Sequence, residues 1–362
     1  MPTIARSILG LGAPFWLALT LSGCGEDGER PSEVNTLRVL AVRAETPFAK
    51  PGTSVELSML AHDGSSRARL RDGTMRRNSA LWIGGCNNPQ GDNYRACMPY
   101  LHEVVKQLGD GHLKAGTLPA DVPSGTVGWG AQFLAVTPSD IIAQRPTAAG
   151  VVFPYATQMV FFADCGGVLR RKPNDSTTFP LGCFDATTGE ELGRDDFEFG
   201  FYPVFVYDNL ENQNPTIEAA RFDGQELGGN CSDSAPCSDN LHCGTARSCI
   251  PVVPRCKQPD KDDCESYRLV IKVPQSAVER ATVAHVTTAE AKNELLWVSY
   301  YANAGSFKQD ARIINDPNSG WSDDTDGLWR AHVASSREVR LWAVVRDNRN
   351  GVAWAVRDVW VD

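Results

Sequence analysis

Apolar and polar residues alternate along much of the chain, in the pattern of half-buried β-strands. Val55, Leu57 and Met59 alternate with Glu56 and Ser58, and a period of two places successive side chains on opposite faces of a strand. Apolar stretches of strand length also cover residues 37–43, 80–86, 158–164 and 197–207. Pro51 and Gly52 supply turn chemistry between the first two strands. The pattern predicts an elaborated β-sandwich over residues 36–210.

A long insertion interrupts this first sandwich between Asn87 and Tyr155. Its residues predict a short helix over 99–108 and a second helix starting at Ser139, separated by turns rich in Gly and Pro. The polar run from Asn209 to Pro215 then predicts a linker between two domains.

The strand pattern resumes in the second half of the chain. Residues 216–227 open a second sandwich, and Tyr267, Leu269, Ile271 and Val273 alternate with polar or smaller residues. The strand over 295–300 carries Trp297 where sandwiches often bury a tryptophan. Val339, Leu341, Ala343 and Val345 alternate before an Asn/Gly turn and a last strand over 352–361, which predicts a closing hairpin. The second domain therefore covers 216–362, interrupted by a cysteine-rich insert at 229–265.

Three stretches resemble known modules. The segments 37–47 and 51–57 and the closing hairpin 342–354 are similar to immunoglobulin-like or PKD-like β-sandwich modules in large surface lipoproteins of Gram-negative bacteria. The resemblance implies a mainly β protein with two immunoglobulin-like sandwiches, the second interrupted by a small disulfide-rich module. It also implies a structural or binding role in the cell envelope.

The N-terminus indicates export and lipidation. One basic residue precedes an apolar stretch over 8–21, which suits the core of a signal peptide and is short for a membrane span. Leu21-Ser22-Gly23-Cys24 resembles the lipobox of bacterial lipoproteins, which implies cleavage after residue 23, acyl chains on Cys24 and a polar tether over 24–35. Gly25, in place of the Asp that favours retention at the inner membrane in enteric lipoproteins, favours the outer membrane. An ordinary secretory signal with a chance cysteine is the alternative.

The other cysteines form an even set, which in an exported chain predicts disulfides. We expect Cys86–Cys97 and Cys165–Cys183 because these cysteines are neighbours in sequence. Within the block we favour Cys231–Cys243, Cys237–Cys249 and Cys256–Cys264 among the 15 possible connectivities. The block resembles small cysteine-rich stalk modules of bacterial surface proteins. Its spacings of five to seven residues lack the two-residue knuckle of zinc sites, so we expect no metal there.

Two features suggest ligands, each with a plainer explanation. The acidic stretch Asp316–Gly327 offers oxygen ligands for calcium but lacks the EF-hand spacing, so a solvated loop is the expectation. Tryptophans near strand ends could stack on sugars, although most are expected in the sandwich cores; these are Trp321, Trp329, Trp342, Trp354 and Trp360.

Catalysis and nucleic-acid binding have little support in the sequence. The net charge is −9 with no basic stripe, so nucleic acid is not an expected partner. No H-E-x-x-H, G-x-S-x-G or phosphate-binding glycine loop occurs, and the histidines are dispersed at 62, 102, 112, 242, 285 and 332. We expect a non-catalytic, lipid-anchored envelope protein without cofactors that binds another envelope protein. The alternatives are a carbohydrate-binding or adhesive lipoprotein and, third, an enzyme or accessory subunit with a site formed by the insertion.

Overall fold

The alternating residues form the strands of a first β-sandwich. A computed structural model describes residues 30–69, 74–76, 78–145, 153–172, 178–225, 229–232, 235–238, 241–258, 260–282 and 291–362, and residues Pro31–Asp362 form one compact unit. One sheet has the order β1 (Leu37–Ala44), β3 (Ser54–Asp63), β6 (Gln132–Val136). The other has the order β2 (Phe48–Ala49), β10 (Phe197–Tyr207), β7 (Tyr155–Cys165), β4 (Ser79–Asn87), β5 (Val127–Trp129).

The core of this sandwich forms between the inner faces of its two sheets. Leu57 and Val55 of β3 pack in one cluster with Trp82 of β4 and Val160 of β7, all of which are buried. The indole N–H of Trp82 donates to the carbonyl oxygen of Gly130 at 2.8 Å, which satisfies the one polar atom of that buried ring.

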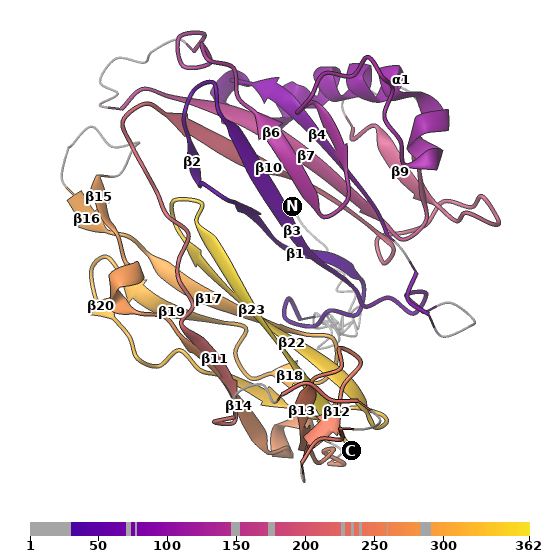
Figure 1. Cartoon of the computed structure of the whole chain (residues 1–362), viewed down its shortest axis with the longest axis vertical. Helices are drawn as coiled ribbons and strands as arrows, with labels where there is room; N and C mark the ends of the chain where they lie inside the picture. The colour runs from indigo at the N-terminus through magenta and orange to yellow at the C-terminus, as the bar shows by residue number, and fades with distance from the viewer. Residues whose placement is uncertain are drawn as a thin grey trace, which may run out of the picture. The chain divides into compact units, whose positions relative to one another are not determined.

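The second sandwich begins in the residues after the linker (Figure 1). Its smaller sheet has the order β11 (Ala219–Phe222), β14 (Ser266–Lys272), β21 (Gly327–Arg330), β18 (Ser306–Phe307). Its larger sheet has the order β12 (Leu241–Cys243), β13 (Cys249–Val253), β23 (Val352–Val361), β22 (Arg337–Asp347), β17 (Leu296–Ala302), β19 (Ala311–Asp316), β20 (Gly320–Trp321). In the part of the chain that the structure describes, two further antiparallel pairs lie outside these sheets, β8 (Val168–Arg171) with β9 (Leu181–Phe184) and β15 (Arg280–Thr282) with β16 (Ala291–Asn293).

Both sandwiches share one strand order. Strands β1, β3 and β6 face β4, β7 and β10, and strands β11, β14 and β21 face β17, β22 and β23. These are the ABE and CFG sheets of an immunoglobulin-like sandwich. In each sandwich a short strand also lies parallel to the last strand, β2 beside β10 and β13 beside β23. The expected fold class, mainly β with two such sandwiches, is confirmed.

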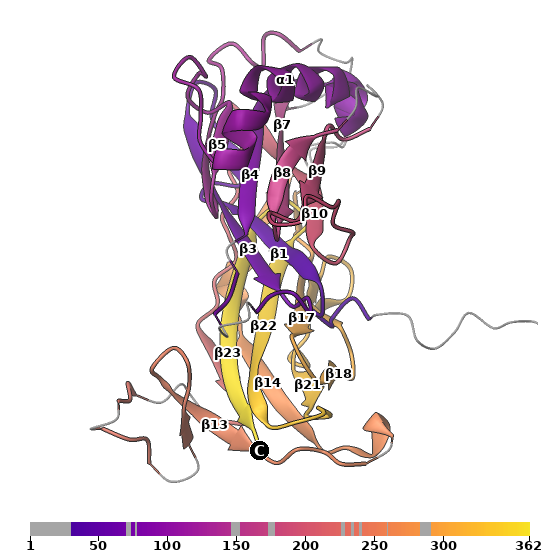
Figure 2. The ribbon, with the colours of Figure 1, turned by 90° about the vertical axis from the view of Figure 1, so that its right-hand side faces the viewer.

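The shared order locates the cysteine-rich insert. In the first sandwich the chain passes from β1 to the parallel strand β2 through three residues, Glu45–Pro47. In the second sandwich the corresponding passage, from β11 to β13, holds the first part of the insert, and the insert then includes β13 and the residues that lead to β14. Figure 2 shows β13 beside the end of β23, where Val253 pairs with Val361. The insert is therefore an enlarged version of the connection from β11 to β14, which corresponds to that from β1 through β2 to β3, and the β-sandwich that it interrupts remains complete.

A helix covers the outer face of the first sandwich (Figure 1). Helix α1 (Met98–Ala115) buries Leu101, Val104, Val105 and Leu108, whose spacing places them on one helical face. They pack on the outward side chains of β4 and β7, including Leu81 and Phe161. Strand β7 is therefore buried on both faces, which explains its nearly continuous apolar sequence.

The helix differs in length from its prediction. It extends past residue 108 to Ala115. The chain departs from helical geometry at Gly109, which has φ 66° and ψ 159°, and resumes it afterwards. The helix ends at Gly116 in the left-handed conformation, a common helix terminator. Among the described residues, short 3₁₀ turns also occur over Gln90–Asp92, Tyr94–Cys97, Lys261–Asp263 and Gln275–Ala277.

Two local predictions were wrong. The segment from Ser139 forms turns, and its hydrogen bonds, Ile141 N to Pro138 O and Gln144 N to Asp140 O, do not repeat at one helical spacing. The Trp297 side chain is only half-buried. Leu296, Val298 and Tyr300 face the core, and because successive side chains of a strand point to opposite faces, Trp297 points away from it. Trp329, in β21, is the buried tryptophan in that core.

The closing hairpin forms in the predicted register, with Val339, Leu341, Ala343 and Val345 in the core. Its turn places Gly351 against the Asp347 carboxylate, where a Cβ atom would lie 2.1 Å from Oδ2, so a larger residue does not fit. Trp342, on the opposite face, packs against Val34 and Leu40 of the N-terminal segment. The hairpin is therefore also covered by the start of the first sandwich.

The predicted linker is held by asparagine side chains. Asn212 donates to the Asp347 carboxylate at 3.2 Å and to the Arg349 carbonyl at 2.9 Å. Asn214 donates to the Ala44 carbonyl at 2.8 Å and accepts from the Val352 N–H at 2.8 Å. These bonds connect the linker to strands of both sandwiches.

Candidate functional site

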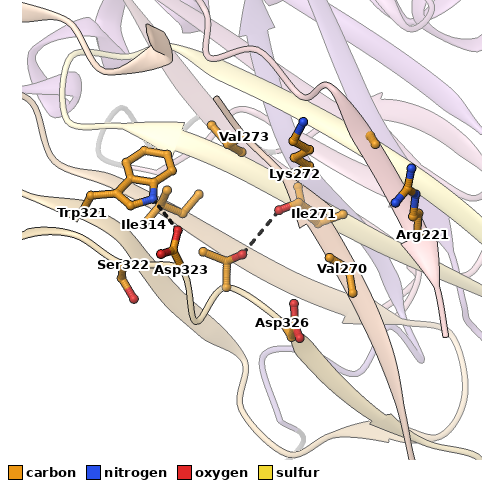
Figure 3. Close-up of a pocket in the computed structure, with 12 residues that line it drawn as sticks. Arg221, Val270, Ile271, Lys272, Val273, Ile314, Trp321, Ser322, Asp323 and Asp326 are labelled. Carbon is orange, nitrogen blue, oxygen red and sulfur yellow. Dashed lines mark hydrogen bonds between the residues drawn. The ribbon is translucent and has the colours of Figure 1, made fainter. Parts of the chain in front are cut away.

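A pocket forms in the second sandwich where two paired strands separate (Figure 3). Strands β14 and β21 pair from Ser266 with Arg330 to Leu269 with Gly327, and β14 then continues to Lys272 without β21 beside it. The loop from Trp321 to Asp326 borders the resulting gap. The cavity measures about 220 Å³ and is lined by Ala219, Arg221, Val270, Ile271, Lys272, Val273, Ile314, Trp321, Ser322, Asp323, Thr325 and Asp326.

Hydrogen bonds hold the loop beside the pocket in place. The indole N–H of Trp321 donates to Oδ1 of Asp323 at 2.9 Å. The hydroxyl of Thr325 donates to the Ile271 carbonyl at 3.4 Å, and its own carbonyl accepts from the Tyr300 hydroxyl. Burial raises the pKa of Tyr300 above its ordinary range, so this hydroxyl keeps the proton that it donates. The pocket is therefore preformed.

The charged groups around the pocket balance one another. Lys272 and Arg221 stand on the β11–β14 side, and Asp323 and Asp326 stand on the loop side. Lys272 forms an ion pair with Glu218 at 2.7 Å, and the Asp326 carboxylate accepts from Nε of Arg268 at 2.7 Å. The pocket consequently carries no strong field of one sign.

The carboxylates of the acidic loop considered for calcium contact different groups of the chain. Asp316 accepts backbone N–H groups of Asn318 and Ser319 at 2.8 Å each, which lowers its pKa. Asp324 lies 3.9 Å from Arg312. Within the described part of the chain, the one group of three His, Cys, Asp or Glu ligand atoms close enough for a metal consists of Cys231, Cys237 and Cys243. Their sulfur atoms are joined in disulfides.

A second candidate surface lies on the outer face of strand β10. Phe199 and Phe201 are 54% and 40% exposed, which is unusual for phenylalanine in a sheet. Tyr94 stacks on Phe201 with ring centroids 4.6 Å apart, and Phe179 stacks on Phe199 at 4.5 Å. We call Tyr94, Phe179, Phe199 and Phe201 the aromatic strip.

The aromatic strip exists because the helix covers only part of the sheet. Inward residues of β10, such as Tyr202 and Val204, lie in the core, so the period of two turns Phe199 and Phe201 outward. The core cluster that contains the buried face of α1 includes outward residues of β4 and β7 but not these two phenylalanines. The strip was not predicted from the sequence, although the alternation of Phe197, Phe199 and Phe201 was a usable signal.

The structure contains five disulfides, with the pairs that the sequence predicted. Cys86–Cys97 connects the β4 strand to the start of α1, and Cys165–Cys183 connects β7 to β9. Within the insert the pairs are Cys231–Cys243, Cys237–Cys249 and Cys256–Cys264. All ten cysteines after Cys24 are therefore paired.

The described histidines are as dispersed in space as in sequence. His62 packs at a tilt against Trp342, His242 stacks on Trp360, and His332 lines a cavity with Glu33 and Ser306. His102 bonds to the Thr178 carbonyl and His112 to the Thr117 hydroxyl. His285 lies outside the described residues. The structure does not bring the others together into one site.

The tryptophans considered for sugar binding have different environments. Trp329 and Trp342 are buried in cores. Trp354 lies under the guanidinium of Arg43 at 4.7 Å, and Trp360 is stacked against His242 at 4.1 Å. Trp321 is half-buried and lines the pocket. Of the five, it is the tryptophan that faces a cavity of ligand size.

The proposed signal peptide over 1–23 and the lipidation residue Cys24 lie outside the described residues. Among the residues that the structure does describe, no helix combines the length and the apolar character needed to cross a membrane.

Comparisons with known proteins give distant likenesses. No family model and no curated protein matches the chain. Similar solved structures include tandem Ig repeats of Dlar (8% identity, 91% of this chain and 98% of that chain covered, TM-score 0.21). The N-terminal Ig1-2 module of the Drosophila receptor protein tyrosine phosphatase DLAR gives 7% identity, 90% and 99% coverage and a TM-score of 0.21. Dimeric latent PorU from Porphyromonas gingivalis gives 10% identity, covers 91% of this chain and 24% of its own chain, and has a TM-score of 0.19. With TM-scores this low, the fold assignment depends on the strand order described above.

Proposed function

We propose that this chain is a non-catalytic, lipid-anchored envelope protein that binds another envelope protein through the aromatic strip. The observation that supports this proposal is the exposure of Phe199 and Phe201, which lie in the same sheet as β4 and β7, whose outer faces α1 covers. Exposed clusters of large apolar side chains on a folded protein commonly mark interaction sites.

The chemistry of the strip favours a protein partner with an apolar surface. Burying a phenylalanine side chain contributes about 1.5–3 kcal/mol, and aromatic residues are enriched among the side chains that dominate interface energies. Phe179 and Tyr94 stack on the two exposed rings and so limit their freedom before binding, which lowers the entropy lost on association. The strip has one polar atom at its surface, the Tyr94 hydroxyl, so it offers few hydrogen bonds to a glycan.

The cysteines support placement outside the cytoplasm. Five disulfides in one chain are typical of an oxidising compartment such as the periplasm or the cell surface. The lipobox resemblance at Cys24 supports a lipid anchor, and Gly25 supports the outer membrane. These residues together favour the cell envelope as the location.

The buried ionisable groups support a non-catalytic role. Burial raises the pKa of Asp164 to about 6 and that of Glu294 to about 7. Their exposed fractions are 2% and 4%, and neither lines the pocket beside Trp321. Perturbed carboxyl groups that act in catalysis need access to a substrate.

Crosslinking in intact cells tests the binding proposal. The double variant Phe199→Ser/Phe201→Ser should lose the crosslinked partner, whereas Ile313→Ser should retain it. Ile313 is a matched control because it is 53% exposed on β19, in the other sandwich. Thermal melts of both variants verify folding. A folded double variant that keeps the full yield of crosslinked partner would contradict the proposal.

A fatty-acid probe tests the anchor. Lipidation requires the sulfur of Cys24, so Cys24→Ala should incorporate no label, while a Ser22→Ala variant, which keeps a small residue before the cysteine, should remain labelled. Undiminished label in Cys24→Ala would exclude lipidation at this residue.

Carbohydrate binding is the second candidate function, and the pocket beside Trp321 is the observation that favours it.

A further inference from the structure

We propose that the pocket beside Trp321 binds one neutral sugar residue at the end of a glycan. This inference concerns the second sandwich and does not depend on the aromatic strip of the first. It gives the carbohydrate-binding candidate a location, a ligand class and a set of contacting residues.

The size of the cavity limits the ligand to about one ring. Pockets for drug-sized ligands measure about 300–1,000 Å³, and this one measures about 220 Å³. The hydrogen bond from the Thr325 hydroxyl to the Ile271 carbonyl joins the loop to β14 at the pocket, which disfavours the passage of an extended peptide between them. A terminal residue that enters from the open side avoids this obstacle.

The lining has the mixed character that a sugar requires. Trp321, Ile314 and Val273 form apolar walls, and Ser322, Asp323 and Lys272 add hydroxyl, carboxylate and ammonium groups (Figure 3). A sugar ring presents C–H groups on its faces and hydroxyl groups around its edge. It can therefore contact an aromatic or aliphatic wall while its hydroxyls bond to the polar groups.

Asp323 is placed to serve both the tryptophan and a ligand. Its Oδ1 accepts the Trp321 indole N–H at 2.9 Å, which holds the ring beside the pocket. A carboxylate has about four acceptor positions, so Asp323 retains capacity for sugar hydroxyls. Because the indole is held before the ligand arrives, less side-chain entropy is lost on binding.

The charge balance favours a neutral ligand. Two cationic and two anionic side chains line the pocket, and Lys272 and Asp326 already have partners in Glu218 and Arg268. An anionic sugar would approach Asp323 and Asp326, and a cation would approach Arg221 and Lys272, with an unfavourable contribution in either case.

Binding of simple glycosides to the full chain in detergent tests the proposal. The probes are the methyl glycosides of glucose, galactose, mannose and N-acetylglucosamine, with methyl glucuronide as an anionic comparison. Isothermal titration and quenching of tryptophan fluorescence should both detect a neutral glycoside. Trp321→Ala and Asp323→Asn should each weaken binding by about tenfold or more, as expected for the loss of one central contact.

Control variants outside the pocket test whether glycoside binding depends on the pocket itself. Trp360→Ala removes a half-buried tryptophan outside the pocket, and Asp316→Asn removes a carboxylate at the end of β19, also outside the pocket. Both should bind like the unmodified chain, as should Phe199→Ser/Phe201→Ser, which tests the aromatic strip alone. Absence of binding by every neutral glycoside, preference for the glucuronide, or equal binding by folded Trp321→Ala would overturn the proposal.

Discussion

His62 of β3 packs against Trp342 of β22, with ring centroids 4.7 Å apart and the ring planes tilted by 56°, and so joins the two sandwiches through one aromatic contact. The contact lies beside the cluster of Val34, Leu40 and Trp342. Burial lowers the pKa of His62 to about 4, and the nearby Arg340 acts in the same direction, against the opposing carboxylates Asp63 and Asp358.

This contact predicts a loss of stability in mild acid. His62 is neutral in the folded chain down to about pH 4, whereas in the unfolded chain it takes up a proton near pH 6.5. The unfolded state therefore binds more protons between these values, and the free energy of unfolding should fall, by on the order of 1–2 kcal/mol, as the pH decreases through this range. Urea unfolding at pH 7, 6 and 5 measures it. His62→Gln should reduce the slope of this pH dependence, and an unchanged slope would contradict the assignment.

The raised pKa of Glu294 predicts a loss of stability as the pH rises. Burial raises its pKa to about 7, and Asp347 and Glu279 nearby oppose its ionisation, although Arg349 favours it. Because the folded chain holds this proton more tightly than the unfolded chain, the free energy of unfolding should fall as the pH rises from about 5 to 8. Glu294→Gln should stabilise the chain at pH 8 by on the order of 2 kcal/mol and leave its stability at pH 5 nearly unchanged. The exposed Glu103→Gln is the control, and an unchanged pH slope in Glu294→Gln would contradict the assignment.

The cysteine-rich insert predicts a local effect of disulfide removal. Cys237→Ser/Cys249→Ser opens a bridge in a segment whose buried large aliphatic residues include Ile250 and Val253. Removing such a bridge costs about 2–4 kcal/mol, which the small insert has little other burial to offset. Limited proteolysis should then cut within residues 229–258, while the melting of the remaining sandwiches changes little. Resistance of the folded variant to proteolysis would show that the two remaining bridges and the pairing of β13 with β23 hold the insert without this one.

The acidic loop predicts insensitivity to calcium. Asp316, Asp323 and Asp326 already accept hydrogen bonds from N–H groups of the chain. An ion bound only by the folded state would raise the melting temperature. We expect calcium and chelator to change it by less than about 1 °C. An increase of several degrees with calcium that disappears in Asp323→Ala or Asp326→Ala would instead assign a metal to this loop.

Part of the candidate pocket was accessible from the sequence. Trp321 stood out as a tryptophan near a strand end, and Asp323 belonged to an acidic stretch considered for calcium. The opposite wall, Ile271 and Lys272, lies about fifty residues earlier in the chain, and strand pairing alone brings it beside the loop. The aromatic strip has the same origin, since Tyr94 and Phe201 are more than one hundred residues apart.

The sequence by itself determined the features that depend on neighbouring residues. These are the strands with a period of two, the closing hairpin and the disulfides, whose partners lie 8 to 18 residues apart. The tertiary structure alone decided which face of each strand meets another layer. Trp342 is buried and Trp297 is half-buried, although both belong to apolar strands, because the first sandwich covers one side of the hairpin. Burial of an outward side chain depends on what packs over it, and that layer comes from residues distant in the chain.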